Sequence, residues 1–236
     1  MQTTGVKSVK LSSMSGFSSL SDPRGFGPSL ARAGVCPSAD QIETLGLYLT
    51  LLERWQGAIN LVSPASLPNA VERHILDSAQ LIPHVPLGAQ NLVDLGSGAG
   101  FPGLVLAILR PGLKVHLIES DQKKCAFLEC VSRETGACVR VYPERIEAFS
   151  APFAVDVLTA RALAPLSGLL SYAQPWFSVN PAMTALFLKG AGAGTELEDA
   201  QALWSFSCET IPSVSDAQGR ILKVRGLQSI SRYKNP

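Results

Sequence analysis

The chain has 236 residues, of which 46% are hydrophobic and 17% are charged, and its formal net charge is +1. This length is enough for one large domain with a sizeable apolar core. A net charge so close to zero gives no general attraction to nucleic acid, so any nucleic-acid surface has to be a local patch. No apolar run reaches the ~18 residues that span a bilayer. We therefore expect a globular protein with no membrane partner.

The first 37 residues differ in composition from the rest of the chain. They are rich in Ser and Gly and contain four basic residues but a single acid, Asp22. Such a stretch buries little apolar surface, so we expect residues 1–37 to be a flexible N-terminal segment. An organelle transit peptide has a similar composition, but Gly and Pro would break the amphipathic helix that it needs.

Two helices are expected next, and together they predict a helical cap over residues 38–86. Residues 38–56 carry apolar side chains at helical spacing on one face, with Ser38 as the N-cap. A second helix is expected over residues 70–81.

From Asn91 onwards, segments typical of strands alternate with segments typical of helices. We expect strands at residues 91–95, 114–119, 138–142, 155–160 and 184–188, and an antiparallel pair at 208–214 and 220–225, with helices at 102–110, 121–135, 164–174 and 195–204. This alternation predicts an α/β fold, a Rossmann-like doubly wound sheet over residues 87–236.

Cysteines and histidines indicate neither disulfides nor a metal. The five cysteines form no CxxC pair and are odd in number, in a chain without a secretory signal. They are typical of reduced thiols in a cytoplasmic protein. The three histidines, His74, His84 and His116, lack the spacing of metal ligands, so we expect no bound metal.

Residues 91–103 are the most informative stretch, because a short apolar strand leads there into a glycine-rich turn and then into a helix. Gly96, Gly98 and Gly100 allow positive φ and let the backbone lie against a ligand. Gly103 allows the helix to pack close to the strand. The last three of these glycines also match GxGxxG, which alone is weak evidence for a dinucleotide site. The turn therefore predicts a nucleotide-type cofactor.

Two carboxylates favour S-adenosylmethionine (SAM) as that cofactor. The negative charge of Asp94, which precedes the first glycine, would repel a pyrophosphate but suits an ammonium and a sulfonium. Glu119 ends the second strand, where it is placed to accept both ribose hydroxyls of an adenosine. Singly, Asp94 could cap a helix and Glu119 could be a solvated strand end. Their order predicts a class I SAM-dependent methyltransferase sheet, with Asp94, Gly96, Gly98 and Glu119 at the cofactor.

Three cations are expected at the carboxyl edge of the same sheet, where ligands of such folds bind. They are Arg145 after the third strand, Arg161 after the fourth and Lys189 after the fifth. Positive charge gathered there suits the phosphates of a polynucleotide better than a small neutral substrate. The alternative is that Arg145 pairs with Glu147, and Arg161 with Asp156, as solvated salt bridges.

Missing motifs narrow the identity of the acceptor atom. Residues 161–166 lack the Asp/Asn-Pro-Pro-aromatic box of methylases that act on exocyclic amines. The Cys-Pro pair, Cys36-Pro37, lies in the N-terminal segment, which argues against the nucleophilic cysteine of a pyrimidine C5 methylase. What remains is an atom with a free lone pair, such as a ring nitrogen, for which positioning can supply most of the acceleration.

Six short motifs follow one another between Gln41 and Gly190. They are Trp55–Ser63, Arg73–Ser78, Val93–Gly103, Arg145–Glu147, Thr159–Ala162 and Leu188–Gly190. In this order they resemble the glucose-inhibited division protein B family, the RsmG-type methyltransferases of 16S ribosomal RNA. Two positions depart from the family pattern, since Glu119 stands where many members have Asp, and Ala160 where many have Ser.

The resemblance implies methylation of guanine N7 in the decoding-region loop of 16S rRNA, as free RNA or within the small ribosomal subunit. By motif position it also implies cofactor contacts at Gly96, Phe101, Ile146, Glu147 and Arg161. Because N7 carries no proton, no residue is assigned as a certain catalytic acid or base.

Positioning of the substrate is expected from Arg145, Arg161 and Lys189, and RNA contacts are expected from Arg145, Lys189 and His74. His74 and Asp77 lie three residues apart and share a helix face. That pair could touch RNA or the edge of the cofactor domain, or could make a hydrogen bond between helices. We expect a monomer.

Three other functions remain open. A small-metabolite methyltransferase would share the whole cofactor site. An NAD-dependent oxidoreductase is favoured by the GxGxxG match and opposed by Asp94. A regulatory protein that binds SAM without catalysis is not excluded by any residue.

Overall fold

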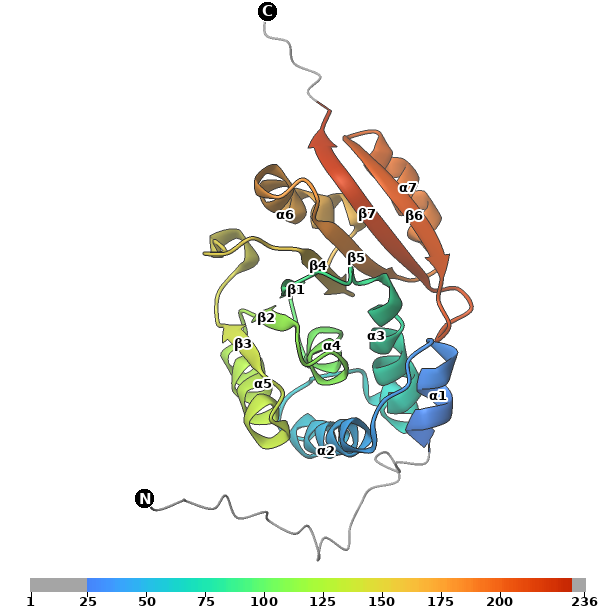
Figure 1. Cartoon of the computed structure of the whole chain (residues 1–236), viewed down its shortest axis with the longest axis vertical. Coiled ribbons are helices and arrows are strands. Elements are labelled where there is room, and N and C mark those ends of the chain that lie inside the picture. The colour runs from blue at the N-terminus through green and yellow to red at the C-terminus, as the bar shows by residue number, and fades with distance from the viewer. Residues whose placement is uncertain (1–24, 231–236) are drawn as a thin grey trace, which may run out of the picture.

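The computed structural model of the protein describes residues 25–230, whose strands form one seven-stranded sheet (Figure 1). The strands are β1 (Asn91–Leu95), β2 (Lys114–Ile118), β3 (Val139–Tyr142), β4 (Val157–Arg161), β5 (Thr184–Lys189), β6 (Trp204–Pro212) and β7 (Arg220–Ser229). Their order across the sheet is β3-β2-β1-β4-β5-β7-β6. The first five are parallel, β7 is antiparallel to β5, and β6 is antiparallel to β7. The chain reverses its direction across the sheet between β1 and β4, and ligands of doubly wound folds bind beside such a point.

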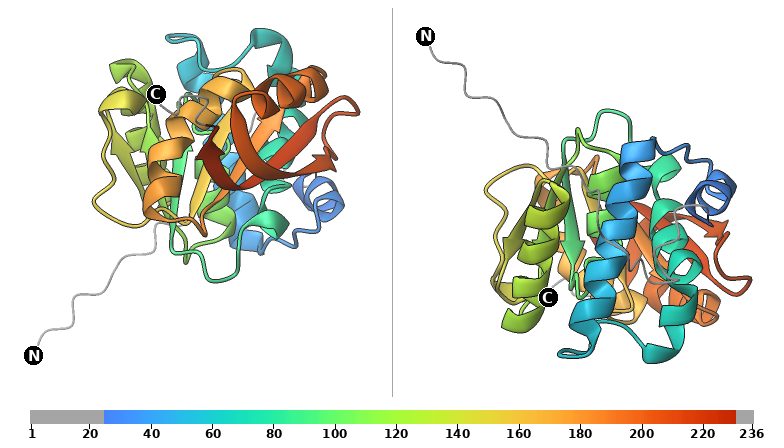
Figure 2. Two further views of the ribbon diagram at one scale, coloured as in Figure 1. Left: turned by 90° about the horizontal axis from the view of Figure 1, so that it is seen from above. Right: turned by 90° about the horizontal axis from the view of Figure 1, so that it is seen from below.

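Helices cover both faces of this sheet (Figures 1 and 2). On one face α4 (Gly103–Leu109) and α5 (Gln122–Thr135) pack with the helices that precede the sheet, and on the other lie α6 (Leu166–Val179) and α7 (Ala193–Gln201). Each face buries its own apolar cluster. The predicted doubly wound α/β fold is confirmed.

The helices before the sheet pack on the face that carries α4 and α5. They are α2 (Ala39–Gln56), the 3-10 helix η3 (Pro64–Asn69), the π-helix η4 (Val71–Leu76), α3 (Asp77–Ala79) and the 3-10 helix η5 (Ile82–His84). Ser38 caps α2 as predicted, since its hydroxyl accepts a hydrogen bond from the Gln41 N–H and the Gln41 side chain accepts one from the Ser38 N–H. The helix predicted over 70–81 is present as two consecutive segments, η4 with π geometry and α3, and it ends at Ala79.

An additional helix, α1 (Phe26–Arg32), lies within the segment expected to be flexible. Phe26 and Leu30 are fully buried, and Arg32 forms a 2.6 Å ion pair with Glu72. The prediction of a flexible segment is therefore wrong for residues 26–32. Phe26 and Leu30 stand four residues apart and give a short helix one apolar face. The high Ser and Gly content of the segment gave no indication of this face. Residues 1–24 lie outside the described residues.

Two further boundaries differ from those predicted. β6 begins at Trp204, within the expected helix 195–204, because Trp204, Phe206 and Cys208 alternate with exposed serines as a half-buried strand requires. Helix α6 continues through Pro175 to Val179, where it buries Trp176 and Phe177. Within residues 25–230, no helix is both long and apolar enough to cross a membrane.

Candidate functional site

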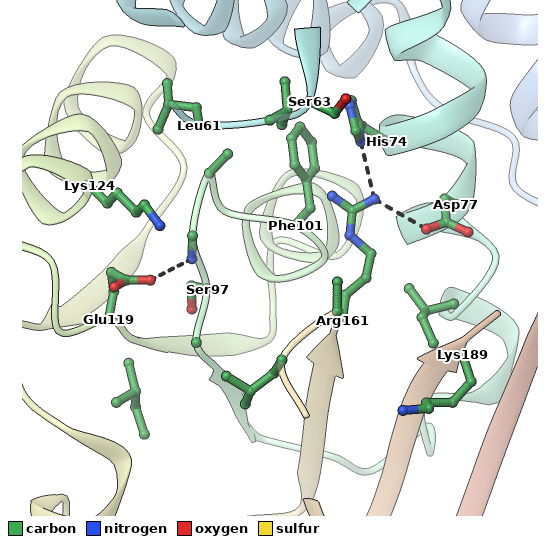
Figure 3. Close-up of a pocket in the computed structure, with 18 of the residues that line it drawn as sticks. Leu61, Ser63, His74, Asp77, Ser97, Phe101, Glu119, Lys124, Arg161 and Lys189 are labelled. Atoms are coloured by element: carbon green, nitrogen blue, oxygen red, sulfur yellow. Dashed lines mark hydrogen bonds and ion pairs between the residues drawn. The ribbon is translucent and has the colours of Figure 1, made fainter. Parts of the chain in front are cut away.

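A cavity of about 790 Å³ opens at the carboxyl ends of β1, β2, β4 and β5 (Figure 3). Its walls come from the glycine-rich turn, from the loops that follow β2, β3 and β4, from η4 and from the β6–β7 turn. The volume lies within the range of small-molecule and cofactor sites. The cavity brings together most of the residues selected from the sequence.

The glycine-rich turn forms the floor between β1 and α4. Gly96, Gly98 and Gly100 have φ of 59°, 57° and 93°, so the predicted left-handed conformations are present. Gly103 packs so closely on β1 that an added Cβ would lie 2.9 Å from the Asp94 Oδ2 atom. Only glycine fits there without a shift of the helix, as predicted.

Glu119 lies in the cavity wall and holds the turn in place. Its Oε2 accepts a 2.9 Å hydrogen bond from the Gly98 N–H (Figure 3). Its Oε1 accepts a 2.8 Å bond from the Asp121 N–H. Asp121 in turn caps α5 through the N–H groups of Lys123 and Lys124. Each carboxylate oxygen of Glu119 keeps a further lone pair for a ligand hydroxyl.

Asp94 lies beneath the turn and outside the cavity wall, which differs from the expected direct contact with the cofactor. Its carboxylate is completely buried, and its Oδ1 accepts a 2.7 Å hydrogen bond from the Thr159 hydroxyl. Its Oδ2 has no hydrogen-bond partner among the described residues. Burial raises the pKa of Asp94 to about 6, although the hydroxyl of Thr159 acts in the opposite direction. The Asp94 carboxylate therefore joins β1 to β4 beneath the turn, and the turn itself contacts Asp94 through the Ser97 hydroxyl, which donates a 3.0 Å hydrogen bond to the Asp94 carbonyl.

The loop after β3 supplies another wall through the 3-10 helix η6 (Ile146–Ala148). Ile146 and Glu147 line the cavity, and a Glu147 oxygen accepts a 3.1 Å hydrogen bond from the Tyr172 hydroxyl. Arg145 precedes η6, and its exposed side chain forms no hydrogen bond or ion pair with any described residue. The salt bridge between Arg145 and Glu147 that we considered is absent from this part of the chain.

Lys189 also lines the cavity, but its charge is already paired. Its ammonium lies 2.6 Å from the Glu196 Oε2 atom and donates a 2.9 Å hydrogen bond to the Ala164 carbonyl. Only 10% of its side chain is exposed. Of the three cations predicted for this edge, Lys189 is thus the least available to RNA.

Arg161 is joined to the preceding helices (Figure 3). Its Nη1 atom lies 3.2 Å from Asp77 Oδ2, 3.2 Å from His74 Nδ1 and 3.0 Å from the Arg73 carbonyl. The alternative salt bridge between Arg161 and Asp156 is therefore wrong, because Arg161 pairs with Asp77. Asp156 instead accepts hydrogen bonds from the N–H groups before and at the start of β1.

His74 lines the cavity but has both ring nitrogens engaged within the protein. Its Nε2 lies 2.8 Å from the Ser66 hydroxyl, and its ring stacks on Phe101 with centroids 4.9 Å apart. Burial, followed by the charge of Arg161, lowers the pKa of His74 to about 3. A neutral, buried imidazole differs from the RNA contact that we expected.

Phe101 supports Arg161 from the turn. Its ring is 3% exposed, and the guanidinium carbon of Arg161 lies 5.0 Å from the ring centroid. The Tyr48 ring stacks on Phe101 at 5.1 Å, and its hydroxyl donates to the Ala99 carbonyl. Phe101 thus borders the cavity chiefly as a platform.

The donor set of the cavity fits an adenosine-containing cofactor. Glu119 offers acceptors for hydroxyl groups, glycine backbone is accessible beside it, and Ile118, Ile146 and Leu163 give apolar walls for a planar base. Within residues 25–230, no three His, Cys, Asp or Glu side chains gather as a metal site would need.

Sequence reasoning assigned no role to several residues of the wall. Asp77 was noticed for its spacing from His74 but was not selected, and Ser66 and Tyr172 gave no signal at all. Asp77 lies inside the motif Arg73–Ser78, so that motif was the available clue.

Solved structures resemble this fold at low identity. A ribosomal protein L11 methylase from Lactobacillus delbrueckii subsp. bulgaricus is 15% identical, with a TM-score of 0.51 over 64% of this chain and 77% of that one. A SAM-dependent methyltransferase from Aquifex aeolicus is 16% identical, with a TM-score of 0.50 over 68% and 93%. The fold is that of the class I SAM-dependent methyltransferases.

Sequence relatives define the protein more closely. A protein of Parvibaculum lavamentivorans, called ribosomal RNA small subunit methyltransferase G, is 52% identical over 80% of this chain and 85% of its own. A protein of the same name from Paramagnetospirillum magneticum is 48% identical over 83% and 93%. The GidB family model, described as rRNA small subunit methyltransferase G, matches residues 41–222. The chain belongs to this family, and the resemblance seen in its motifs is confirmed.

Proposed function

We propose that the protein binds SAM in this cavity and methylates N7 of a guanine in the decoding-region loop of 16S ribosomal RNA. The observation that carries the proposal is the glycine-rich turn held by Glu119 at the switch point of the sheet, in a chain of the rRNA small subunit methyltransferase G family. Family membership favours this function over a small-metabolite methyltransferase, an oxidoreductase or a regulatory SAM-binding protein.

The cofactor residues divide along the cavity. Glu119 would accept the ribose hydroxyls, while Gly96 and Gly98 would let the backbone lie against the ligand. Ile146 and Glu147 would border the adenine, and Arg161, with Phe101 beneath it, would border the other end of the cofactor. Asp94 would act indirectly by fixing the turn. When bound, SAM supplies an electrophilic methyl group.

Methylation at N7 needs no general base, and the histidine of the described wall is a poor one. His74 is the imidazole nearest the acceptor end, but both its nitrogens are engaged and its pKa of about 3 makes it a weak base. Because guanine N7 has a lone pair and no proton, alignment of the base with the methyl group can supply most of the acceleration. The protein then serves to bind SAM and the guanine, to align them with each other, and to exclude water.

RNA phosphates would be held chiefly by Arg145, which is exposed at the cavity rim and unpaired among the described residues. Lys124 lines the same rim and is a second candidate. Lys189 would have to leave Glu196 before it could bind a phosphate. We further propose that the protein acts as a monomer, because the described residues of one chain supply every wall of the cavity. We also propose that it acts in the cytoplasm.

Mass spectrometry of 16S RNA tests the proposed reaction. RNA from cells that lack the protein should lose one methylated guanine, and the purified protein with SAM should restore it on naked RNA or on isolated small subunits. An unchanged modification map would refute the assignment to 16S RNA. Sedimentation of the protein alone would test the monomer.

A further inference from the structure

Arg161 is held along one edge of its guanidinium. All its hydrogen bonds within residues 25–230 are made by Nη1, which faces Asp77, His74 and the Arg73 carbonyl. In Figure 3 the other terminal nitrogen points away from His74 and Asp77, toward the side of the cavity where Phe101 lies. Only 18% of the Arg161 side chain is exposed and 19% of that of Asp77, so this ion pair is far less solvated than a surface salt bridge.

Asp77 joins three parts of the chain through its two oxygens. While Oδ2 faces Arg161 at the end of β4, Oδ1 accepts a 2.6 Å hydrogen bond from the Ser215 hydroxyl in the β6–β7 turn. The same Oδ1 accepts a 3.0 Å bond from the Gln80 side chain, which also bonds the β6–β7 turn through the Val214 N–H. These contacts fix the orientation of the Asp77 carboxylate independently of Arg161.

His74 is fixed with its acceptor toward Arg161. Because Nδ1 faces an arginine, which can only donate, the ring proton must be on Nε2, where it is donated to the Ser66 hydroxyl. That hydroxyl donates in turn to the Ser63 carbonyl at 2.6 Å. The imidazole therefore has one consistent tautomer, in which Nδ1 accepts from Arg161 and Nε2 donates to Ser66.

We infer that Asp77 and His74 are positioning residues, which hold Nη1 of Arg161 so that its Nε and Nη2 donors are presented to the bound cofactor. The inference rests on the proposed function in taking Arg161 as a cofactor contact. A free arginine side chain has many rotamers, and its loss of freedom on binding would weaken affinity. Here the preceding helices and the β6–β7 turn restrict the side chain before the ligand arrives.

Calorimetry with S-adenosylhomocysteine tests this inference without any RNA. Asp77→Asn keeps the size of the side chain and removes its charge, and we expect it to weaken binding about tenfold. Glu72→Gln is the matched control, since Glu72 lies in η4, directly before the segment that contains Asp77, but pairs with Arg32 on α1, away from the cavity. We expect the control to bind within about twofold of the wild type.

A double-mutant cycle separates positioning from general damage. Arg161→Met should weaken binding more than Asp77→Asn does, and adding Asp77→Asn to it should cause little further loss. Equal losses from Asp77→Asn in both backgrounds would overturn the inference, as would unchanged binding in either single variant. If the wild type does not bind S-adenosylhomocysteine, the proposed function itself fails.

A second variant guards against misfolding of Asp77→Asn. His74→Phe keeps an aromatic ring to stack on Phe101 but removes both hydrogen bonds. We expect about threefold weaker binding, again only while Arg161 is present. Circular dichroism melting of each variant establishes that it is folded, and a folded His74→Phe with wild-type affinity would count against the role of His74.

Discussion

The two sides of the cavity are built in different ways. On the β1–β2 side, Glu119 holds the glycine-rich turn through backbone N–H groups, and the Gly98 contact joins residues only 21 apart in the sequence. On the β4 side, Arg161 contacts Asp77 from 84 residues away, and Asp77 contacts Ser215 from 138 residues away. The first side is local and depends on the backbone, whereas the second is assembled by tertiary packing of side chains.

This difference predicts that the first side is the more sensitive to loss of one residue. Glu119→Ala leaves the N–H groups of Gly98 and Asp121 without their acceptor and removes the proposed ribose contact. We expect affinity for S-adenosylhomocysteine to fall about ten- to a hundredfold, as for loss of a charge-assisted hydrogen bond worth ~1.5–3 kcal/mol. Calorimetry measures this, with Glu129→Ala on exposed α5 surface as control. If Glu119→Ala and the control bound S-adenosylhomocysteine equally well, the proposed difference between the two sides of the cavity would be wrong.

The same difference explains what the sequence could reveal. The order of strands and helices, the left-handed glycines and the position of Glu119 follow from periodicity and local spacing. The partner of Arg161 could not be predicted, because Asp77 and Asp156 are equally plausible until the packing of η4 on the sheet is known. Helix α1 was missed for a similar reason, since seven residues give little periodic signal without the surface that buries Phe26 and Leu30.

The β4 side should be the more sensitive to pH, because it contains a buried neutral histidine. The pKa of His74 is lowered from 6.5 to about 3, so the unfolded chain binds a proton that the folded chain does not between these values. Stability from this group is complete above pH 6.5 and falls as pH decreases, by up to about 1.4 kcal/mol per pH unit. Asp94 acts in the opposite direction, because its raised pKa favours the folded state as pH falls from about 6 toward 3.8.

Urea unfolding at pH 7.5 and pH 5.5 checks the contribution of His74. His74→Phe removes the pH dependence that comes from the histidine but keeps the opposing contribution of Asp94. We expect the wild type to lose about 1.4 kcal/mol more than the variant between these two pH values. Parallel losses in both proteins would show that His74 is protonated as readily in the fold as in the unfolded chain.

The link between Asp77 and the β6–β7 turn should have a smaller effect on stability. Ser215→Ala removes the 2.6 Å hydrogen bond to Asp77 Oδ1 and a 3.3 Å bond from the Gln80 side chain, but it leaves the bond from the Val214 N–H to Gln80. We expect a loss of about 1 kcal/mol in the free energy of unfolding. Thermal melting checks this, and Ser171→Ala, whose hydroxyl bonds only within α6, is the control. If both variants melt together, this link adds nothing beyond a local hydroxyl contact.

The smallest expected effect concerns Arg145, which is compared with the paired cation Lys189. The side chain of Arg145 is exposed and has no partner among the described residues, whereas that of Lys189 is paired with Glu196 and 10% exposed. If Arg145 binds a phosphate, Arg145→Ala should weaken RNA binding a few-fold and reduce the slope of log affinity against log salt by about 1. Lys189→Ala should leave that slope unchanged, because its charge is already neutralised.

Arg133→Ala, which removes an equal charge from α5 at a side chain outside the cavity wall, controls for the general field of the protein. A slope that falls equally in Arg145→Ala and Lys189→Ala would mean that RNA displaces Glu196 from Lys189, and the β4 side would then be rearranged by its substrate rather than assembled before it.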